Sequence, residues 1–171
     1  MKWIKSLGGP LILLPRDSVH LWSGSFGPAG EDDWDEEDTD YERIAGGVTD
    51  FAEAVDVRGK SALVLANGNS PTCFLESHSL FVQLLATSSE VDVVAAVTRI
   101  LPSIHWQHST EWLCEGPSLL FDSAMYGPDV GDEHGLEVNV GAGKYMVRCA
   151  YREPDSSAGI WVALTMLVPI T

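Results

Sequence analysis

Residues 143–168 read GKYMVRCAYREPDSSAGIWVALTMLV, and this stretch decides the fold class. Its apolar residues occupy every second position in two runs, Tyr145 to Tyr151 and Ile160 to Val168, which is the spacing of a strand with one buried face. Polar residues 153–159 separate the runs and predict a turn. The two runs are therefore expected to be neighbouring antiparallel strands.

Upstream segments extend the same period. Leu136 to Val140 alternates before the first run, so the last third of the chain is expected to form a β-meander. Residues 106–112 alternate as well, and Gly116-Pro117 turns the chain into a strand over 118–121. Earlier still, residues 62–66 and 72–75 are short β-like runs joined by five turn-forming residues, which predicts a hairpin.

Two central segments depart from period two. Residues 79–87 and 90–101 each have apolar residues at helical spacing, with Ser89 as a candidate N-cap of the second segment and Pro102 after its end. The predicted fold is α+β: mainly antiparallel β-sheet with two central helices packed on one face and a C-terminal β-meander. One domain is expected to span residues 1–171, with an acidic loop at about 23–42.

Charge limits the partners that this chain can bind. Its 25 acidic and 10 basic side chains give a formal net charge of −15, which opposes nucleic acid and anionic membrane surfaces and attracts a cationic protein. No apolar run approaches the roughly 18 residues that a membrane span requires. Three widely spaced cysteines, an odd number, predict buried reduced thiols and a cytoplasmic protein.

The acidity is concentrated in one segment. Nine of the twelve residues from Glu31 to Glu42 are acidic and none is basic, so the segment carries −9 of the −15. Such a run is most often a solvated loop. Trp34 and Tyr41 lie inside it, however, and large aromatic side chains are typical anchors of protein interfaces. The predicted partner-binding residues are Glu31, Asp32, Asp33, Trp34, Asp35, Glu36, Glu37, Asp38, Asp40 and Tyr41.

Catalytic and metal-binding motifs are not evident in the sequence. The five histidines lack metal-ligand spacing, the acidic run lacks the mid-loop glycine of an EF-hand, and there is no G-x-S-x-G or phosphate-binding loop. We therefore expect no enzyme, cofactor or metal ion. Two alternatives stay open: a small-molecule-binding or hydrolytic domain with a pocket near Asp122, Ser123 and His134, and a plain scaffold protein.

Several short motifs, in order along the chain, resemble those of the immunity protein 21 family of bacterial polymorphic toxin systems. They begin with the stretch from Trp3 to Ile12 and include a W-x-G and a D-Y-x-R element. The matching segments are 3–12, 22–24, 40–43, 62–65, 72–75, 112–117, 120–124 and 143–147. Residues 25–39, most of the acidic loop, match no motif of the family.

The resemblance implies that the chain neutralises a cognate toxin by stoichiometric binding, without a cofactor or turnover. It does not identify the chemistry of the toxin. Combined with the charge, it leads us to expect a basic toxin domain whose cationic surface contacts the acidic loop.

Overall fold

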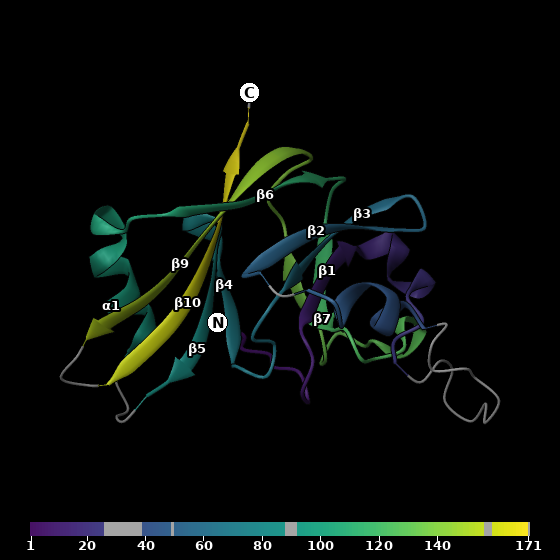
Figure 1. Ribbon diagram of the computed structural model, residues 1–171, viewed down its shortest axis with the longest axis horizontal. Coiled ribbons are helices and arrows are strands. Elements are labelled where there is room, and N and C mark those ends of the chain that lie inside the picture. Colours follow the sequence, from purple (N-terminus) through teal and green to yellow (C-terminus); the bar gives the residue numbers. More distant parts are fainter. Residues whose placement is uncertain (26–38, 49, 88–91, 156–158, 171) are drawn as a thin grey trace.

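The computed structural model describes residues 1–25, 39–48, 50–87, 92–155 and 159–170, which form two five-stranded antiparallel sheets (Figure 1). The first sheet has the order β2-β3-β1-β7-β8. Its strands are β1 (Leu11–Pro15), β2 (Ala52–Val57), β3 (Lys60–Leu65), β7 (Ser118–Asp122) and β8 (Leu136–Val138). The second sheet has the order β4-β5-β10-β9-β6. Its strands are β4 (Thr72–Leu75), β5 (Leu80–Ala86), β6 (Gln107–Cys114), β9 (Gly143–Asp155) and β10 (Ile160–Pro169).

Helical structure is sparse in these residue ranges. The α-helix α1 (Val93–Ile100) confirms one of the two predicted helices, although Asp92 caps it and not Ser89, which lies outside the described residues. The Asp92 carboxylate accepts a hydrogen bond of 3.0 Å from the Ala95 amide. The remaining helical segments are three to six residues long and lie at Arg16–Leu21, Tyr41–Ala45, Glu76–His78, Leu101–Ser103 and Gly127–Asp129.

The prediction of a helix over 79–87 is wrong, because this segment forms β5 and pairs with β4 and β10. Leu80, Phe81 and Val82 are all fully buried, since both faces of the strand are covered. A strand covered on both faces is apolar at consecutive positions, so its sequence also satisfies a helical pattern.

The predicted hairpin over 62–75 is also wrong. β3 and β4 belong to different sheets, and residues 66–71 cross from one sheet to the other. The same holds for β8 and β9, so the C-terminal meander reduces to the β9–β10 hairpin, which is confirmed. Turn-forming residues show where a chain reverses direction, but the partner of each strand depends on distant residues.

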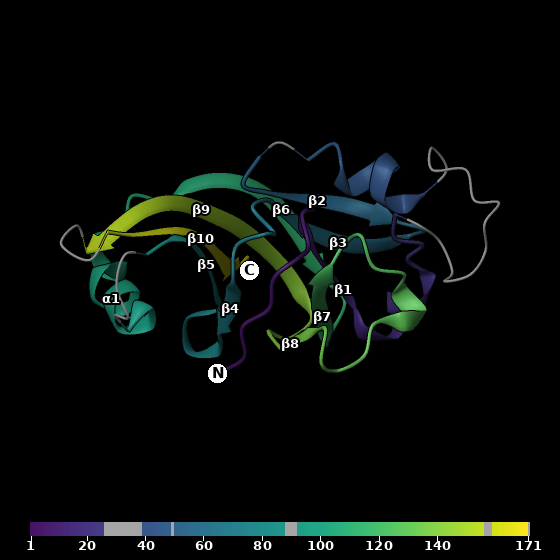
Figure 2. The same cartoon turned by 90° about the horizontal axis from the view of Figure 1, so that it is seen from below.

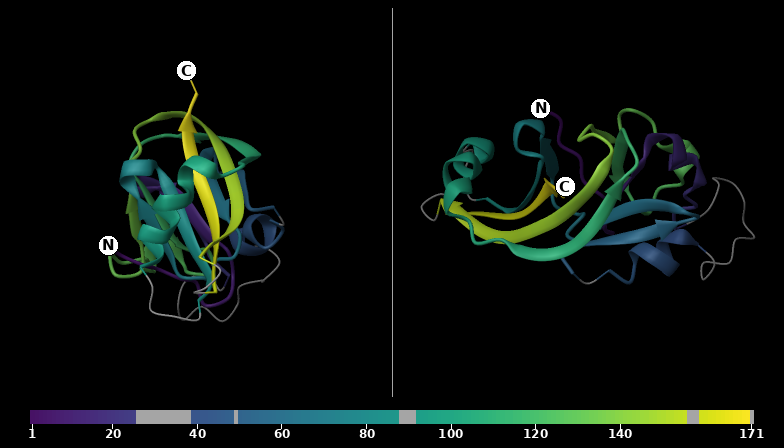
Figure 3. Two further views of the ribbon diagram at one scale, coloured as in Figure 1. Left: turned by 90° about the vertical axis from the view of Figure 1, so that its left-hand side faces the viewer. Right: turned by 90° about the horizontal axis from the view of Figure 1, so that it is seen from above.

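Apolar side chains form three layers around the two sheets. Leu13, Phe74 and Trp112 belong to the layer between the sheets. Alternate residues of β1, such as Ile12, point instead to a second layer, where the turns after β1 and around Tyr41 cover the outer face of the first sheet. The third layer lies between α1 and the second sheet, whose long strands arch past the helix (Figures 2 and 3). Only one helix therefore covers the second sheet in the described part of the chain.

All three cysteines are free and buried, as predicted. Burial raises the pKa of the Cys73 thiol from 9.0 to about 12. Between these values the unfolded thiol ionises and the folded thiol stays protonated, so the free energy of unfolding should fall as the pH rises through this window.

At pH 8 we expect an aromatic disulfide reagent to label the native thiols far more slowly than those of the urea-unfolded chain. Fast labelling of a native thiol would contradict this.

Candidate partner-binding surface

Eight of the ten predicted partner-binding residues, Glu31 to Asp38, lie outside the described residues. The structure does describe both ends of the acidic segment, Ser23 to Ser25 on one side and Thr39 to Tyr41 on the other. The Tyr41 amide donates a hydrogen bond of 3.2 Å to the Gly24 carbonyl. The two ends therefore lie side by side on the outer surface of the first sheet.

Asp40 links these two ends. Its side chain is completely buried, and it accepts a 2.9 Å hydrogen bond from the Ser23 amide, while its own amide donates to the Ser23 hydroxyl at 2.7 Å. Arg43 forms an ion pair with one carboxylate oxygen, and Arg58 lies 3.4 Å from the other. The Asp40 carboxylate contacts the chain's own arginines and the Ser23 amide. It therefore stabilises the fold, and the side chain is not exposed to a partner. We name Ser23, Asp40, Arg43 and Arg58 the Asp40 clamp.

Tyr41 is the second described residue of the predicted surface. Its ring is partly buried and packs at the edge of the layer that covers the first sheet. A Cβ atom at Gly9 would lie only 2.7 Å from this ring, so the glycine permits the close approach of the backbone. Tyr41 thus packs against the body of the protein at the base of the acidic segment.

The alternative pocket near Asp122, Ser123 and His134 is not formed. Asp122 accepts hydrogen bonds of 2.9 Å from the amides of Leu7 and Ala124. The Ser123 hydroxyl is buried and donates to the Pro10 carbonyl at 2.7 Å, whereas His134 is exposed and its nearest charged partner is Glu133, at 3.5 Å. The serine therefore lacks the contact with a base that nucleophilic catalysis requires.

These contacts explain several of the sequence motifs. Ser123 and Asp122 fasten the segment from Leu7 to Pro10 to the end of β7, and the Trp22 indole donates to the Ser123 carbonyl at 2.7 Å. Residues that are far apart in the sequence thus converge beside the Asp40 clamp. Their pairing depends on the tertiary structure, so no local pattern could have shown it.

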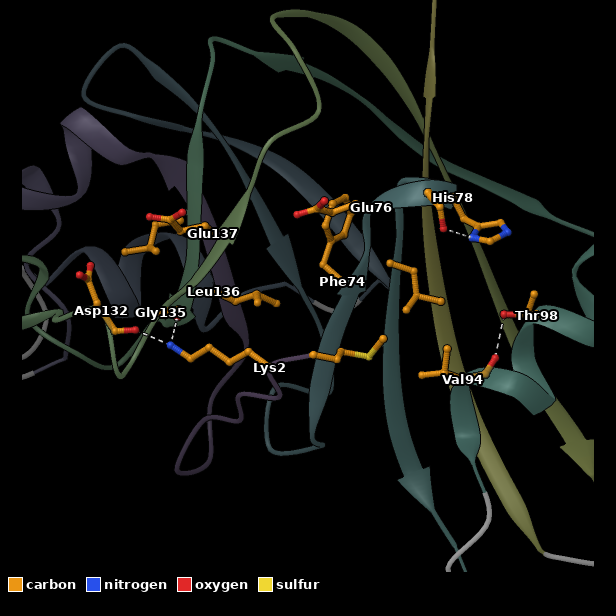
Figure 4. Close-up of a pocket in the computed structure, with 14 residues that line it drawn as sticks. Lys2, Phe74, Glu76, His78, Val94, Thr98, Asp132, Gly135, Leu136 and Glu137 are labelled. Carbon is orange, nitrogen blue, oxygen red and sulfur yellow. Dashed lines mark hydrogen bonds between the residues drawn. The ribbon is translucent and has the colours of Figure 1, made fainter.

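A groove of about 760 Å³ lies at the β8 edge of the first sheet, between β8, β4 and α1 (Figure 4). Its apolar lining comes from five separate segments and consists of Met1, Phe74, Leu75, Val94, Leu119 and Leu136. Its exposed rim is polar and consists of Glu76, Ser77, His78, Thr98, Asp132 and Glu137. No sequence motif points to this groove, because its residues are scattered between positions 1 and 137.

Lys2 crosses one end of the groove. Its ammonium group donates to the backbone carbonyls of Asp132 and Gly135, just before β8 (Figure 4). Arg16 lies beside the rim, 2.9 Å from the Asp132 carboxylate, and it also pairs with Glu137. Among the described residues, no group of three or more His, Cys, Asp or Glu side chains is arranged to hold a metal ion.

Comparison with known protein families identifies a match over most of the chain. The model of the immunity protein 21 family matches residues 2–158. No curated protein sequence and no solved structure matches the chain significantly. Within the described residues, no helix has the length and apolarity needed to cross a membrane.

Proposed function

Because the chain belongs to the immunity protein 21 family, we propose that it protects the producing cell by binding a cognate bacterial toxin stoichiometrically in the cytoplasm. The proposed toxin domain is basic, and the acidic segment from Glu31 to Asp38 is a contact surface for it, with Asp40 and Tyr41 at its base. Neutralisation of this kind needs no turnover and no cofactor.

The concentration of charge is the observation that carries this proposal. Nine acidic residues within twelve positions create a strong local negative field, which raises the association rate with a positively charged protein. The Asp40 clamp supports the proposal, because it holds both ends of the segment against a two-sheet body. Holding the ends restricts the positions that the segment can take, and so lowers the entropy lost on binding.

Charge reversal within the acidic segment tests the proposal. In a variant with Asp33, Asp35, Glu36 and Asp38 changed to lysine, we expect at least tenfold weaker binding to the cognate toxin domain. Calorimetry measures the affinity, and urea denaturation should show an unchanged midpoint.

The matched control reverses four exposed acidic residues of the body, Asp50, Glu53, Glu111 and Asp129. This variant has the same net charge, so a specific role of the segment predicts that it binds distinctly more tightly than the segment variant. Equal losses would assign the effect to net charge alone. A wild-type protein that fails to bind the toxin would contradict the proposed function.

A further inference from the structure

We infer that the groove between β4 and β8 is a second toxin contact, which receives an extended segment with an apolar side chain next to a lysine or arginine. This inference rests on the proposed function and names the chemistry of the segment that is recognised. It concerns a different surface from the acidic segment, because the groove and the Asp40 clamp share no residue.

Both walls of the groove are end strands. β4 is the last strand of the second sheet and β8 the last strand of the first. End strands have backbone donors and acceptors that can pair with an added strand. Figure 4 shows Phe74 of β4 and Leu136 of β8 within the groove, so an extended segment placed there would lie along the edges of both sheets.

The hydrogen bonds of β4 show which of its backbone groups are directed outward. Thr72 exchanges hydrogen bonds of 2.9 and 2.7 Å with Ile4 in an isolated bridge, so its N–H and C=O groups point away from β5. Phe74 is two residues further along the same strand, and its backbone groups therefore point the same way. Among the described residues, the bridge at Ile4 is the one backbone pairing of the N-terminal segment with β4, and the Phe74 backbone forms no hydrogen bond with that segment.

The lining and the rim define the chemistry of the occupant. The lining is apolar and suits an aliphatic or aromatic side chain. On the β4 side, Glu76 is exposed and forms no ion pair with any residue that the structure describes. On the β8 side, Arg16 pairs with Asp132 and Glu137, and the Lys2 ammonium lies at the Asp132 and Gly135 carbonyls, so positive and negative side chains balance there. The Glu76 carboxylate on the other side complements a positive charge next to an apolar side chain.

The charge of the whole chain favours a foreign protein over a second copy of this one. At a net charge of −15, two copies repel each other at long range. The same field attracts a basic toxin domain and directs it toward the groove as well as toward the acidic segment.

Two variants test the groove without disturbing the core. Thr98→Arg places a large side chain at an exposed position on the rim, and Glu76→Lys combined with Glu137→Lys reverses one charge on each wall. Each variant should bind the cognate toxin domain at least tenfold more weakly in calorimetry. Glu53→Lys combined with Glu111→Lys matches the double reversal on exposed strand positions outside the groove and should bind within twofold of wild type. Urea denaturation should confirm that all variants fold.

The outcomes separate this inference from the proposed function. If the wild-type protein binds the toxin and both groove variants bind within twofold of it, the inference is overturned and the proposed function stands. Equal losses in the groove and control reversals would also overturn it, because the field of the whole protein would then explain the effect. A wild-type protein that dimerises in sedimentation and becomes monomeric on Thr98→Arg would identify a second copy as the occupant. A wild-type protein that does not bind the toxin would overturn both.

Discussion

Trp22→Ala is expected to lower the free energy of unfolding by about 4 kcal/mol. Trp22 is completely buried in the layer that covers the outer face of the first sheet, where it packs with Val64 and Phe121. Alanine would leave a cavity and would also remove the indole donor of the Ser123 carbonyl. Domains of this size unfold with about 5–15 kcal/mol, so the variant should retain a small part of its stability in urea denaturation.

Two further tryptophan variants separate the causes of this loss. Trp22→Phe keeps an aromatic ring and removes the hydrogen bond, so most of the packing should survive and the cost should be about 1–2 kcal/mol. Trp161→Ala removes a tryptophan that is 47% exposed and should cost less than about 1 kcal/mol. A Trp22→Ala variant no less stable than Trp161→Ala would show that this layer contributes little to stability.

The comparison of β5 with α1 shows what the sequence could predict about the fold. Both segments have apolar residues at helical spacing, and α1 follows Asp92, whose carboxylate binds the Ala95 amide. β5 begins with four consecutive buried residues, as strands covered on both faces often do. A serine, Ser79, also precedes β5, so a capping residue type alone does not distinguish the helix from the strand.

Strand positions were more predictable than strand partners. The alternating runs in β9 and β10 predicted both strands and their pairing, because the turn between them joins immediate neighbours. The same reasoning failed where the connection after β3 crosses to the other sheet. In that connection a Cβ atom on Gly68 would lie 2.2 Å from the Gly9 carbonyl oxygen, a long-range contact that no local pattern contains.

The candidate surface was predictable only in part. Composition located the acidic segment, but it could not distinguish Asp40 from the eight other acidic residues of the run. The spacing of Asp40 and Arg43 permits a local ion pair, whereas Ser23 and Arg58 join the clamp through tertiary folding. Whether a given acid faces a partner or its own chain therefore depends on residues outside the motif.

Asp40→Ala is expected to cost about 3 kcal/mol, on the scale of losing one member of a buried ion pair. The Ser23 amide would lose its acceptor in a buried site, and two arginines would lose their shared carboxylate. Asp56→Ala is the matched control, because its exposed carboxylate also accepts from a backbone amide, that of Gly59, at 3.0 Å. It should cost less than about 1 kcal/mol in the same urea titration.

The consequence for binding follows from where the lost hydrogen bonds lie. If the clamp holds the acidic segment, the amides of Ser23 and Tyr41 should exchange with solvent faster in Asp40→Ala than in wild type, at temperatures where the variant remains folded. Toxin affinity should fall in parallel, because the released segment loses more conformational entropy on binding. Faster exchange with unchanged affinity would show that the clamp stabilises the fold without positioning the segment. Unchanged exchange would mean that the remaining backbone contacts hold the two ends together, namely those from the Tyr41 amide to the Gly24 carbonyl and from the residue-40 amide to the Ser23 hydroxyl.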